Sequence, residues 1–128
     1  MRYLLDTHAF LWFINGDNQL SFMARQAIQD TANDKMVSIA SLWEISIKLN
    51  IGKLQLDMPY KDLMWHMNIN GFQLLPVQFE HTTTLTTLEL HHGDPFDRII
   101  ISQALTEDLT VISRDKNFNE YRDLKLLW

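Results

Sequence analysis

The chain has 128 residues, of which 46% are hydrophobic, and its formal net charge is -5 at pH 7. This length and hydrophobic content suit one packed domain, which we expect to span residues 1–128. The absence of cysteine excludes a disulfide framework and a thiolate metal site, and it fits a reducing cytoplasm. The negative charge argues against a general basic surface for nucleic acid, and no run approaches the ~20 apolar residues that a membrane span needs.

The first half of the chain alternates short strand-like runs with longer helical runs. In chain order we expect a strand at 2–5, helices at 7–13 and 22–32, a strand at 35–38, and helices at 39–50 and 59–68. Ser21 has the hydroxyl that a helix N-cap needs, and Pro59 suits the first turn of a helix. Gly52 marks the end of the helix at 39–50.

The second half continues the same alternation. We expect a strand at 72–77, helices at 79–90 and 95–107, a strand at 109–113 and a last edge strand at 124–128. The helix at 79–90 is rich in threonine, which has a low helix propensity. Strands that alternate with helices in this way predict an α/β fold, a sandwich in which helices flank a mainly parallel sheet.

Two histidines and two aspartates stand close together in the segment HHGDPFD, residues 91–97. Histidines in the last turn of a helix suit its dipole, and Gly93 suits the position that ends the helix. His91 and His92 are therefore expected to close one helix. Asp94 and Pro95 have the residue types of an N-cap and a first helical position, so they are expected to open the next helix.

Four acids follow strands or lie in the first turns of helices. They are Asp6, Glu44, Asp97 and Asp115. In an open parallel sheet the carboxyl ends of the strands form the ligand crevice, especially where the strand order reverses. The four carboxylates are therefore expected to meet at one edge of the sheet, and they leave a net charge of only -1 on the rest of the chain.

Each acid also has a purely structural interpretation. Asp6 suits a helix N-cap, Glu44 can pair with Lys48 one helical turn later, Asp97 suits a first helical turn, and Asp115 suits a turn. Together, however, two carboxylates about 4 Å apart repel by roughly 4 kcal/mol at an effective dielectric near 20. Such a cluster needs raised pKa values or a cation, and oxygen ligands of this kind suit Mg²⁺ or Mn²⁺.

The chain resembles PIN-domain proteins in four segments, in matching order: LLDTHAFLW, VSIASLWEISIKLNIGKL, HHGDPFDRIIISQA and VISRDKNF. It is most similar to the VapC-type ribonuclease toxins of type II toxin–antitoxin pairs, over about residues 3 to 118. The resemblance implies a PIN-like α/β/α fold and Mg²⁺- or Mn²⁺-dependent cleavage of RNA by a metal-activated water. It also implies a cognate antitoxin protein as a partner.

The resemblance assigns roles to the four acids. It implies that Asp6 and Asp97 bind the metal directly, that Asp115 binds it directly or through water, and that Glu44 holds a second ion or the metal-bound water. The hydroxyls of Thr7 and Ser113 stand where the family often places groups that hydrogen-bond these acids.

Three cationic residues adjoin the acids and are candidates for contacts with substrate phosphates. They are Arg98, Arg114 and Lys116. A structural ion pair is an equally good interpretation of each. The histidines are not needed for the attack, and His8, which lies two residues after Asp6, is expected to pack or to support the site.

The middle of the chain has more apolar residues than one face of two short helices can bury. They are Trp43, Ile47, Leu49, Leu54, Met64, Trp65 and Met67. A surplus suits a homodimer interface or a groove for an antitoxin helix.

Two further functional classes stay open. A phospho-acceptor receiver domain has a similar length and build, but it expects an acid pair after its first strand, where this chain has Asp6 followed by Thr7. The same segment argues against a haloacid-dehalogenase-type phosphatase, which needs Asp-x-Asp where this chain has DTH. A non-catalytic PIN module that binds proteins is the second alternative, although the complete set of acids argues against it.

Overall fold

The computed structural model describes residues 1–128 of the chain. Its centre is a five-stranded sheet in the order β3-β2-β1-β4-β5, and every neighbouring pair is parallel. The strands are β1 (Arg2–Leu5), β2 (Asp34–Ser38), β3 (Phe72–Leu75), β4 (Thr110–Ile112) and β5 (Lys125–Leu127). The predicted α/β fold with a mainly parallel sheet is confirmed.

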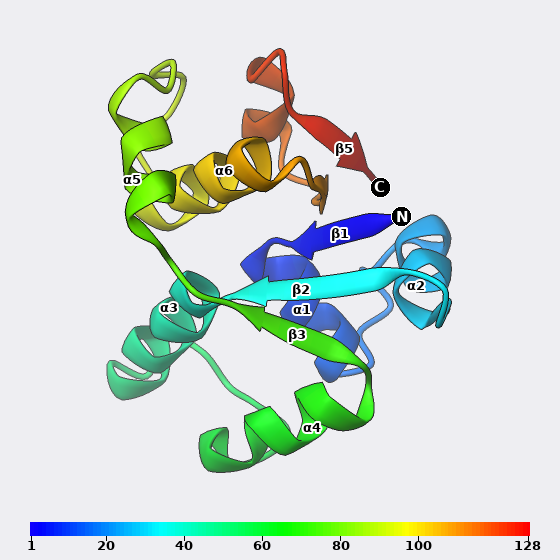
Figure 1. Ribbon diagram of the computed structural model, residues 1–128. Helices are drawn as coiled ribbons and strands as arrows, with labels where there is room; N and C mark the ends of the chain where they lie inside the picture. Colours follow the sequence, from blue (N-terminus) through cyan, green and yellow to red (C-terminus); the bar gives the residue numbers. More distant parts are fainter.

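Helices cover both faces of the sheet (Figure 1). The α-helices are α1 (Thr7–Ile14), α2 (Phe22–Gln29), α3 (Ile39–Asn50), α4 (Leu63–Ile69), α5 (Phe79–Thr86) and α6 (Pro95–Glu107), and the 3-10 helices are η1 (Tyr60–Asp62) and η2 (Lys116–Glu120). α5 and α6 lie on one side of the sheet, and α1, α3 and α4 lie on the other (Figure 1). No helix has the length and hydropathy required to cross a bilayer.

Two hydrophobic clusters hold these layers together. Leu5 of β1 faces the cluster that includes α1 to α4, while its neighbour Leu4 faces the cluster that includes α6. Successive residues of a strand point to opposite faces, so a fully buried strand is apolar on both. The run RYLL of β1 has three buried residues in succession and therefore occupies the middle of the sheet.

The strand order reverses between β1 and β4. The chain builds β1, β2 and β3 outward in one direction, and it then returns through α6 to place β4 on the other side of β1. Leu5 and Ile112 are register partners at the carboxyl ends of these two strands, and the amide of Asp6 donates to the carbonyl of Ile112 at 3.1 Å. The residues that follow β1 and β4 therefore lie side by side, where open parallel sheets form their ligand crevice.

Most element boundaries match the prediction, and the exceptions have local causes. α3 and α6 have the predicted bounds, but α2 ends at Gln29, three residues early, and β3 ends at Leu75, before Pro76. The predicted helix at 59–68 begins as the 3-10 turn η1 and continues as α4.

The expected helix at 79–90 is too long, because α5 ends at Thr86. The prediction that His91, His92 and Gly93 close this helix is therefore wrong. These residues lie in an irregular segment before α6, and Gly93 does not adopt the left-handed backbone of a helix-ending glycine. The start of α6 is as predicted: Asp94 caps it by accepting hydrogen bonds from the first-turn amides, and Pro95 follows.

Candidate functional site

Asp6 lies at the turn between β1 and α1 and is almost fully buried, with 4% of its surface exposed. Its Oδ1 accepts a hydrogen bond from the amide of Ala9 at 2.8 Å, so it caps α1. Its Oδ2 accepts a hydrogen bond from the hydroxyl of Ser113 at 2.5 Å. Burial raises the pKa of Asp6, and these two hydrogen bonds oppose the rise. The structural interpretation of Asp6 is correct, and it is compatible with a role in the site.

Ser113 connects the ends of β1 and β4. Besides donating to Asp6, its Oγ accepts a hydrogen bond from the amide of Asp115 at 3.0 Å. Asp115 caps η2 through a hydrogen bond from the amide of Asn117 to its Oδ1 at 2.9 Å, and its side chain is half-buried. One buried hydroxyl thus ties the positions of two of the predicted acids together.

Glu44 reaches the same region from the second turn of α3. It is 5% exposed, and its Oε2 lies 2.8 Å from Nζ of Lys48. Its Oε1 is buried and has no hydrogen-bond partner. A buried polar oxygen without a partner is rare in proteins, and one explanation is a bound ion or water.

Asp97 lies in the first turn of α6 and shows that the acids share one electrostatic environment. Burial and then repulsion by the acids Asp94, Asp6, Asp115 and Glu44, in that order, raise its pKa from 3.8 to about 8. The other three predicted site acids are thus all close enough to Asp97 for their charges to act on it. His92 Nε2 lies 3.5 Å from its Oδ2, and His92 Nδ1 pairs with the hydroxyl of Tyr121 at 2.9 Å.

The donor set suits a hard divalent cation, since it consists of carboxylate oxygens at a desolvated site. The unpartnered Oε1 of Glu44 and the repulsion at Asp97 are both features that a cation would relieve. No three His, Asp or Glu side chains, however, stand close enough together to hold an ion between them in their present conformations. Metal binding therefore stays a prediction, in which one or two of these carboxylates and water molecules would be the ligands.

The predicted hydroxyl partners differ in what they contact. The hydroxyl of Ser113 hydrogen-bonds Asp6, as described above. The hydroxyl of Thr7 instead donates to Oγ of Ser41 at 2.9 Å, so it joins α1 to α3 and hydrogen-bonds none of the acids.

The three cationic candidates also lie in different surroundings. The guanidinium of Arg98 donates to the hydroxyl of Tyr121 and to backbone carbonyls of the segment before α6, namely those of Leu88, Glu89 and His92. These contacts give Arg98 a structural role. Lys116 is exposed, and Arg114 is exposed with its guanidinium over the ring of Trp12.

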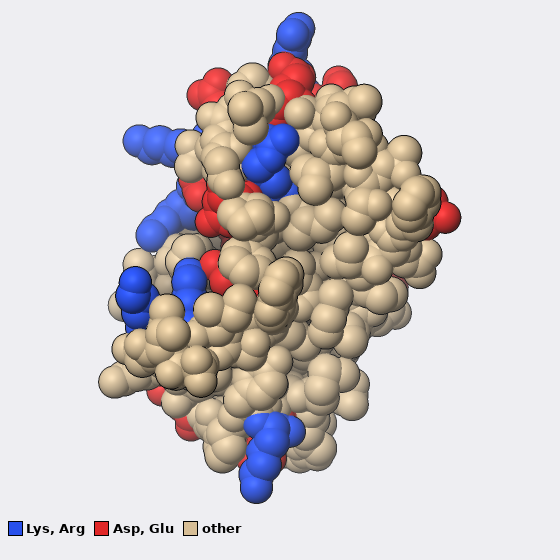
Figure 2. All heavy atoms as spheres, turned by 90° about the vertical axis from the view of Figure 1, so that its left-hand side faces the viewer, with Lys and Arg blue, Asp and Glu red and all other residues tan.

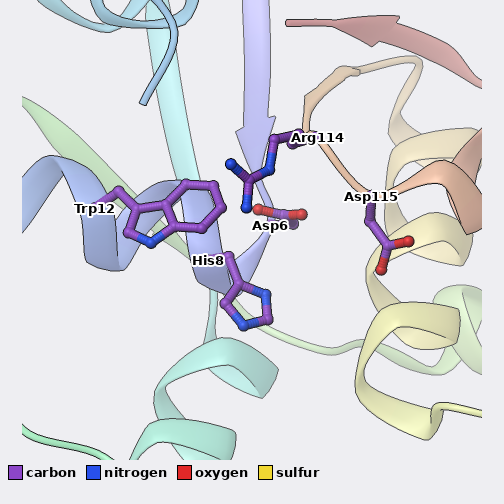
Figure 3. Close-up of a pocket in the computed structure, with 5 residues that line it drawn as sticks. All are labelled: Asp6, His8, Trp12, Arg114 and Asp115. Carbon is purple, nitrogen blue, oxygen red and sulfur yellow. The ribbon is translucent and has the colours of Figure 1, made fainter. Parts of the chain in front are cut away.

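A pocket of about 220 Å³ opens beside Asp6 (Figure 3). It is lined by Asp6, His8, Trp12, Arg114 and Asp115. Trp12 was not predicted as a site residue. The sequence does carry a signal for it: Trp12 follows His8 by four residues, and residues four apart on a helix share a face. No comparable sequence signal predicts the contact of His92 with Asp97 or that of His92 with Tyr121.

The fold and the gathered acids define an α/β protein with an acidic site at the switch point of a parallel sheet. The PIN domain family model matches residues 3–124, and the chain therefore belongs to the PIN-domain family. This confirms the predicted family and leaves the receiver and phosphatase alternatives without support.

Known relatives of the chain span nearly its whole length. The chain is 26% identical over 122 residues to ribonuclease VapC22 of Mycobacterium tuberculosis (strain ATCC 25618 / H37Rv), a match that covers 93% of this chain and 91% of the relative. Its fold is similar to that of VapBC2 from Rickettsia felis bound to a DNA fragment from its promoter, with a TM-score of 0.73, 17% identity, and 99% and 98% of the two chains covered. It is also similar to VapBC-1 from nontypeable Haemophilus influenzae, with a TM-score of 0.70, 20% identity, and 99% and 97% covered.

Proposed function

We propose that this chain is a metal-dependent endoribonuclease, the toxin of a toxin–antitoxin pair, which hydrolyses RNA phosphodiester bonds. The observation that carries the proposal is the raised pKa of Asp97, which burial raises most and to which repulsion by Asp6, Asp115 and Glu44 adds. An acidic site of this kind at a sheet's switch point suits Mg²⁺ or Mn²⁺. The relative named as a ribonuclease supports RNA as the substrate.

The four acids have distinct tasks in this proposal. Asp6 and Asp97 would hold the metal directly, Asp115 directly or through water, and Glu44 would hold a second ion or a water. When bound, the metal would polarise the phosphodiester and lower the pKa of water. Ser113 fixes the orientation of Asp6 through its hydrogen bond, and Lys48 leaves the second oxygen of Glu44 free.

The test is cleavage of single-stranded or looped RNA by the purified protein. We expect cleavage with Mg²⁺ or Mn²⁺, its loss in EDTA, and its loss in Asp6→Asn and in Asp97→Asn. Asp57→Asn is the matched control, because Asp57 is exposed in a loop outside the site. Undiminished cleavage by both site variants would contradict the proposal, and no cleavage by the unchanged protein would favour the non-catalytic PIN module.

The proposal includes a protein partner. Four of the seven apolar residues predicted as a surplus are exposed: Trp43, Ile47, Met64 and Trp65. An apolar groove of about 460 Å³ lies between α3, α5 and α6, and it is lined by Ile39, Ala40, Trp43, Val77, Thr82, Leu85, Pro95, Phe96 and Ile99. Figure 2 shows this side of the molecule, where residues other than Lys, Arg, Asp and Glu cover most of the centre and right.

Large exposed apolar areas mark protein interaction surfaces. The solved VapBC structures that share this fold support an antitoxin as a partner of this chain. A homodimer is the second assembly that the apolar surplus suits. Light scattering distinguishes the two by molar mass. A doubled mass of the isolated chain indicates a homodimer, and a larger mass only with the product of an adjacent small reading frame indicates an antitoxin complex.

A further inference from the structure

The pocket beside Asp6 contains a cation and two aromatic rings for which the proposed hydrolysis has no task. We propose that this pocket is a subsite for one nucleotide of single-stranded RNA. Arg114, held on Trp12, contacts a backbone phosphate, and the adjoining base stacks on the ring of His8. The inference rests on the proposed function, because it assigns a substrate contact at the same site.

Arg114 is held in place without an acid partner. Its Cζ lies 4.4 Å from the centre of the Trp12 ring, and its Nη2 donates to Oε1 of Gln19 at 3.4 Å. It forms no ion pair with Asp6 or Asp115, although all three side chains line the same pocket (Figure 3). Its charge and most of its donors therefore stay available, and a guanidinium fork matches the oxygens of a phosphate.

Trp12 provides a rigid support for this cation. It is half-buried on α1, it packs against the hydrophobic core, and its ring contacts that of Trp128 edge-on at 5.8 Å. The guanidinium thus lies over an anchored ring, which restricts its position in the pocket beside Asp6. Trp12 is a positioning residue in this arrangement, since it acts on the substrate through Arg114.

His8 presents an exposed ring in the same pocket. It lies one helical turn before Trp12, with 5.7 Å between the ring centres, and it makes no hydrogen bond through its side chain. Unpaired RNA bases stack on exposed aromatic rings, histidine included. An aromatic ring next to a cation is the combination that binds one nucleotide of a single strand.

The size and charge of the pocket agree with this assignment. Its volume of about 220 Å³ is below the roughly 300–1,000 Å³ of pockets that enclose a small molecule, so it suits one unit of a chain that continues outside. The neighbouring carboxylates would repel an RNA backbone, and the uncompensated charge of Arg114 offsets that repulsion locally.

The test uses binding rather than cleavage. Short fluorescein-labelled single-stranded RNAs are titrated with the full chain in Ca²⁺ and, separately, in EDTA, and fluorescence anisotropy is recorded. One series carries a single abasic site at successive positions, and a second carries a single neutral methylphosphonate linkage. We expect the unchanged protein to lose roughly tenfold in affinity at one base position and at one adjacent linkage.

Variants of the two exposed residues then separate the contacts. His8→Ala should bind the unmodified RNA about tenfold more weakly and become insensitive to the abasic site. Arg114→Gln should lose sensitivity to the neutral linkage, and Arg114→Lys should restore little, because lysine lacks the planar group that stacks on Trp12. Trp12→Phe should reduce the sensitivity of binding to the neutral linkage, because Arg114 loses part of its support. His66→Ala on α4 and Arg122→Gln in the turn after η2 serve as matched controls with unchanged binding, because neither residue lines this pocket.

The inference is overturned if His8→Ala and Arg114→Gln respond to every modified RNA as the unchanged protein does, or if the unchanged protein binds no RNA. Loss of sensitivity at one position in each variant supports it. The proposed hydrolysis is tested separately, by cleavage in Mg²⁺. If the protein cleaves RNA but the variants respond to the modified RNAs as the unchanged protein does, the subsite is refuted and the ribonuclease proposal remains.

Discussion

The hydroxyl of Ser113 hydrogen-bonds the carboxylate of Asp6 at 2.5 Å, and 107 positions separate the two residues in the sequence. This contact joins the first and fourth strands of the sheet at the place where the strand order reverses. It is the most direct link between the fold and the acidic site, and it makes the orientation of Asp6 depend on one side chain.

Replacing Ser113 by alanine should weaken metal binding while the fold is retained. The change leaves Asp6 Oδ2 and the amide of Asp115 without their partner, and loss of a residue that orients a metal ligand typically costs ~10–100-fold in metal affinity. Calorimetric titration with Mn²⁺ measures the affinity. Ser46→Ala is the matched control, and equal affinities for the two variants would contradict the assigned role.

The raised pKa of Asp97 predicts how stability depends on pH in the absence of metal. The folded state keeps the proton until about pH 8, whereas the unfolded state releases it near 3.8. Between these values the unfolded state binds fewer protons, so this group's contribution to stability falls as pH rises from about 4 to about 8.

The measurement is the melting temperature across this range with EDTA present. We expect it to fall more steeply with pH in the unchanged protein than in Asp97→Asn, which cannot ionise at this position. A divalent ion that displaces this proton should bind more tightly as the pH rises toward 8. Its affinity should increase by up to about tenfold for each pH unit. Parallel curves for the two proteins would show that Asp97 is not protonated in the folded state.

The unpartnered oxygen of Glu44 leads to a separate prediction. Glu44→Gln removes a buried carboxylate whose charge repels Asp97, so without metal the melting temperature should hold or rise, while the affinity for Mg²⁺ should fall by at least about tenfold. Thermal shift with and without Mg²⁺ measures both effects. Glu120→Gln, at an exposed position, is the control, and stabilisation of both variants by Mg²⁺ to the same extent would refute the prediction.

Arg98 is predicted to contribute to stability rather than to substrate binding. Its guanidinium bonds three backbone carbonyls and the hydroxyl of Tyr121, so Arg98→Ala should cost about 2–3 kcal/mol of unfolding free energy. Urea denaturation measures the loss, and hydrogen exchange should show faster opening of residues 88–93. A variant of unchanged stability with a raised KM for RNA would instead support the phosphate contact that the sequence suggested.

The apolar groove predicts a protein contact that can be disrupted without damage to the fold. Val77→Glu places a charge in the groove, where Val77 is 38% exposed, and should reduce assembly with a second copy or with an antitoxin by at least about tenfold. Analytical ultracentrifugation measures assembly. Leu90→Glu, outside the groove and 80% exposed, is the control. Equal assembly of both variants would exclude the groove as an interface.

The sequence predicts the layers of this protein well because each element has a local signal. Ser21 and Asp94 cap the helices that they were expected to cap, and three successive buried residues mark β1 as a central strand. The end of α5 could not be predicted in this way. Its threonines donate to backbone carbonyls three or four residues earlier, which is compatible with a helix, yet their weak propensity does not sustain the helix beyond Thr86.

The sequence predicts which acids belong to the site, but it does not predict the contacts that surround them. The acids follow strands, and the rule that carboxyl ends of parallel strands meet was sufficient to group them. The partners of Arg98 and His92 include Tyr121, which lies 23 and 29 residues away, and no local pattern encodes such a pairing. The conformation of each side chain, which determines whether an ion can bind, also depends on these distant contacts.

The reversal of strand order between β1 and β4 also determines when the site is complete during synthesis. A ribosome produces Asp6 first and Glu44 and Asp97 later, but the serine that orients Asp6 follows β4. Until that segment emerges, β1 has a free edge on one side, and the acidic cluster lacks its fourth member. The nascent chain therefore passes through most of translation without an assembled acidic site, and the site is complete only after synthesis has passed β4.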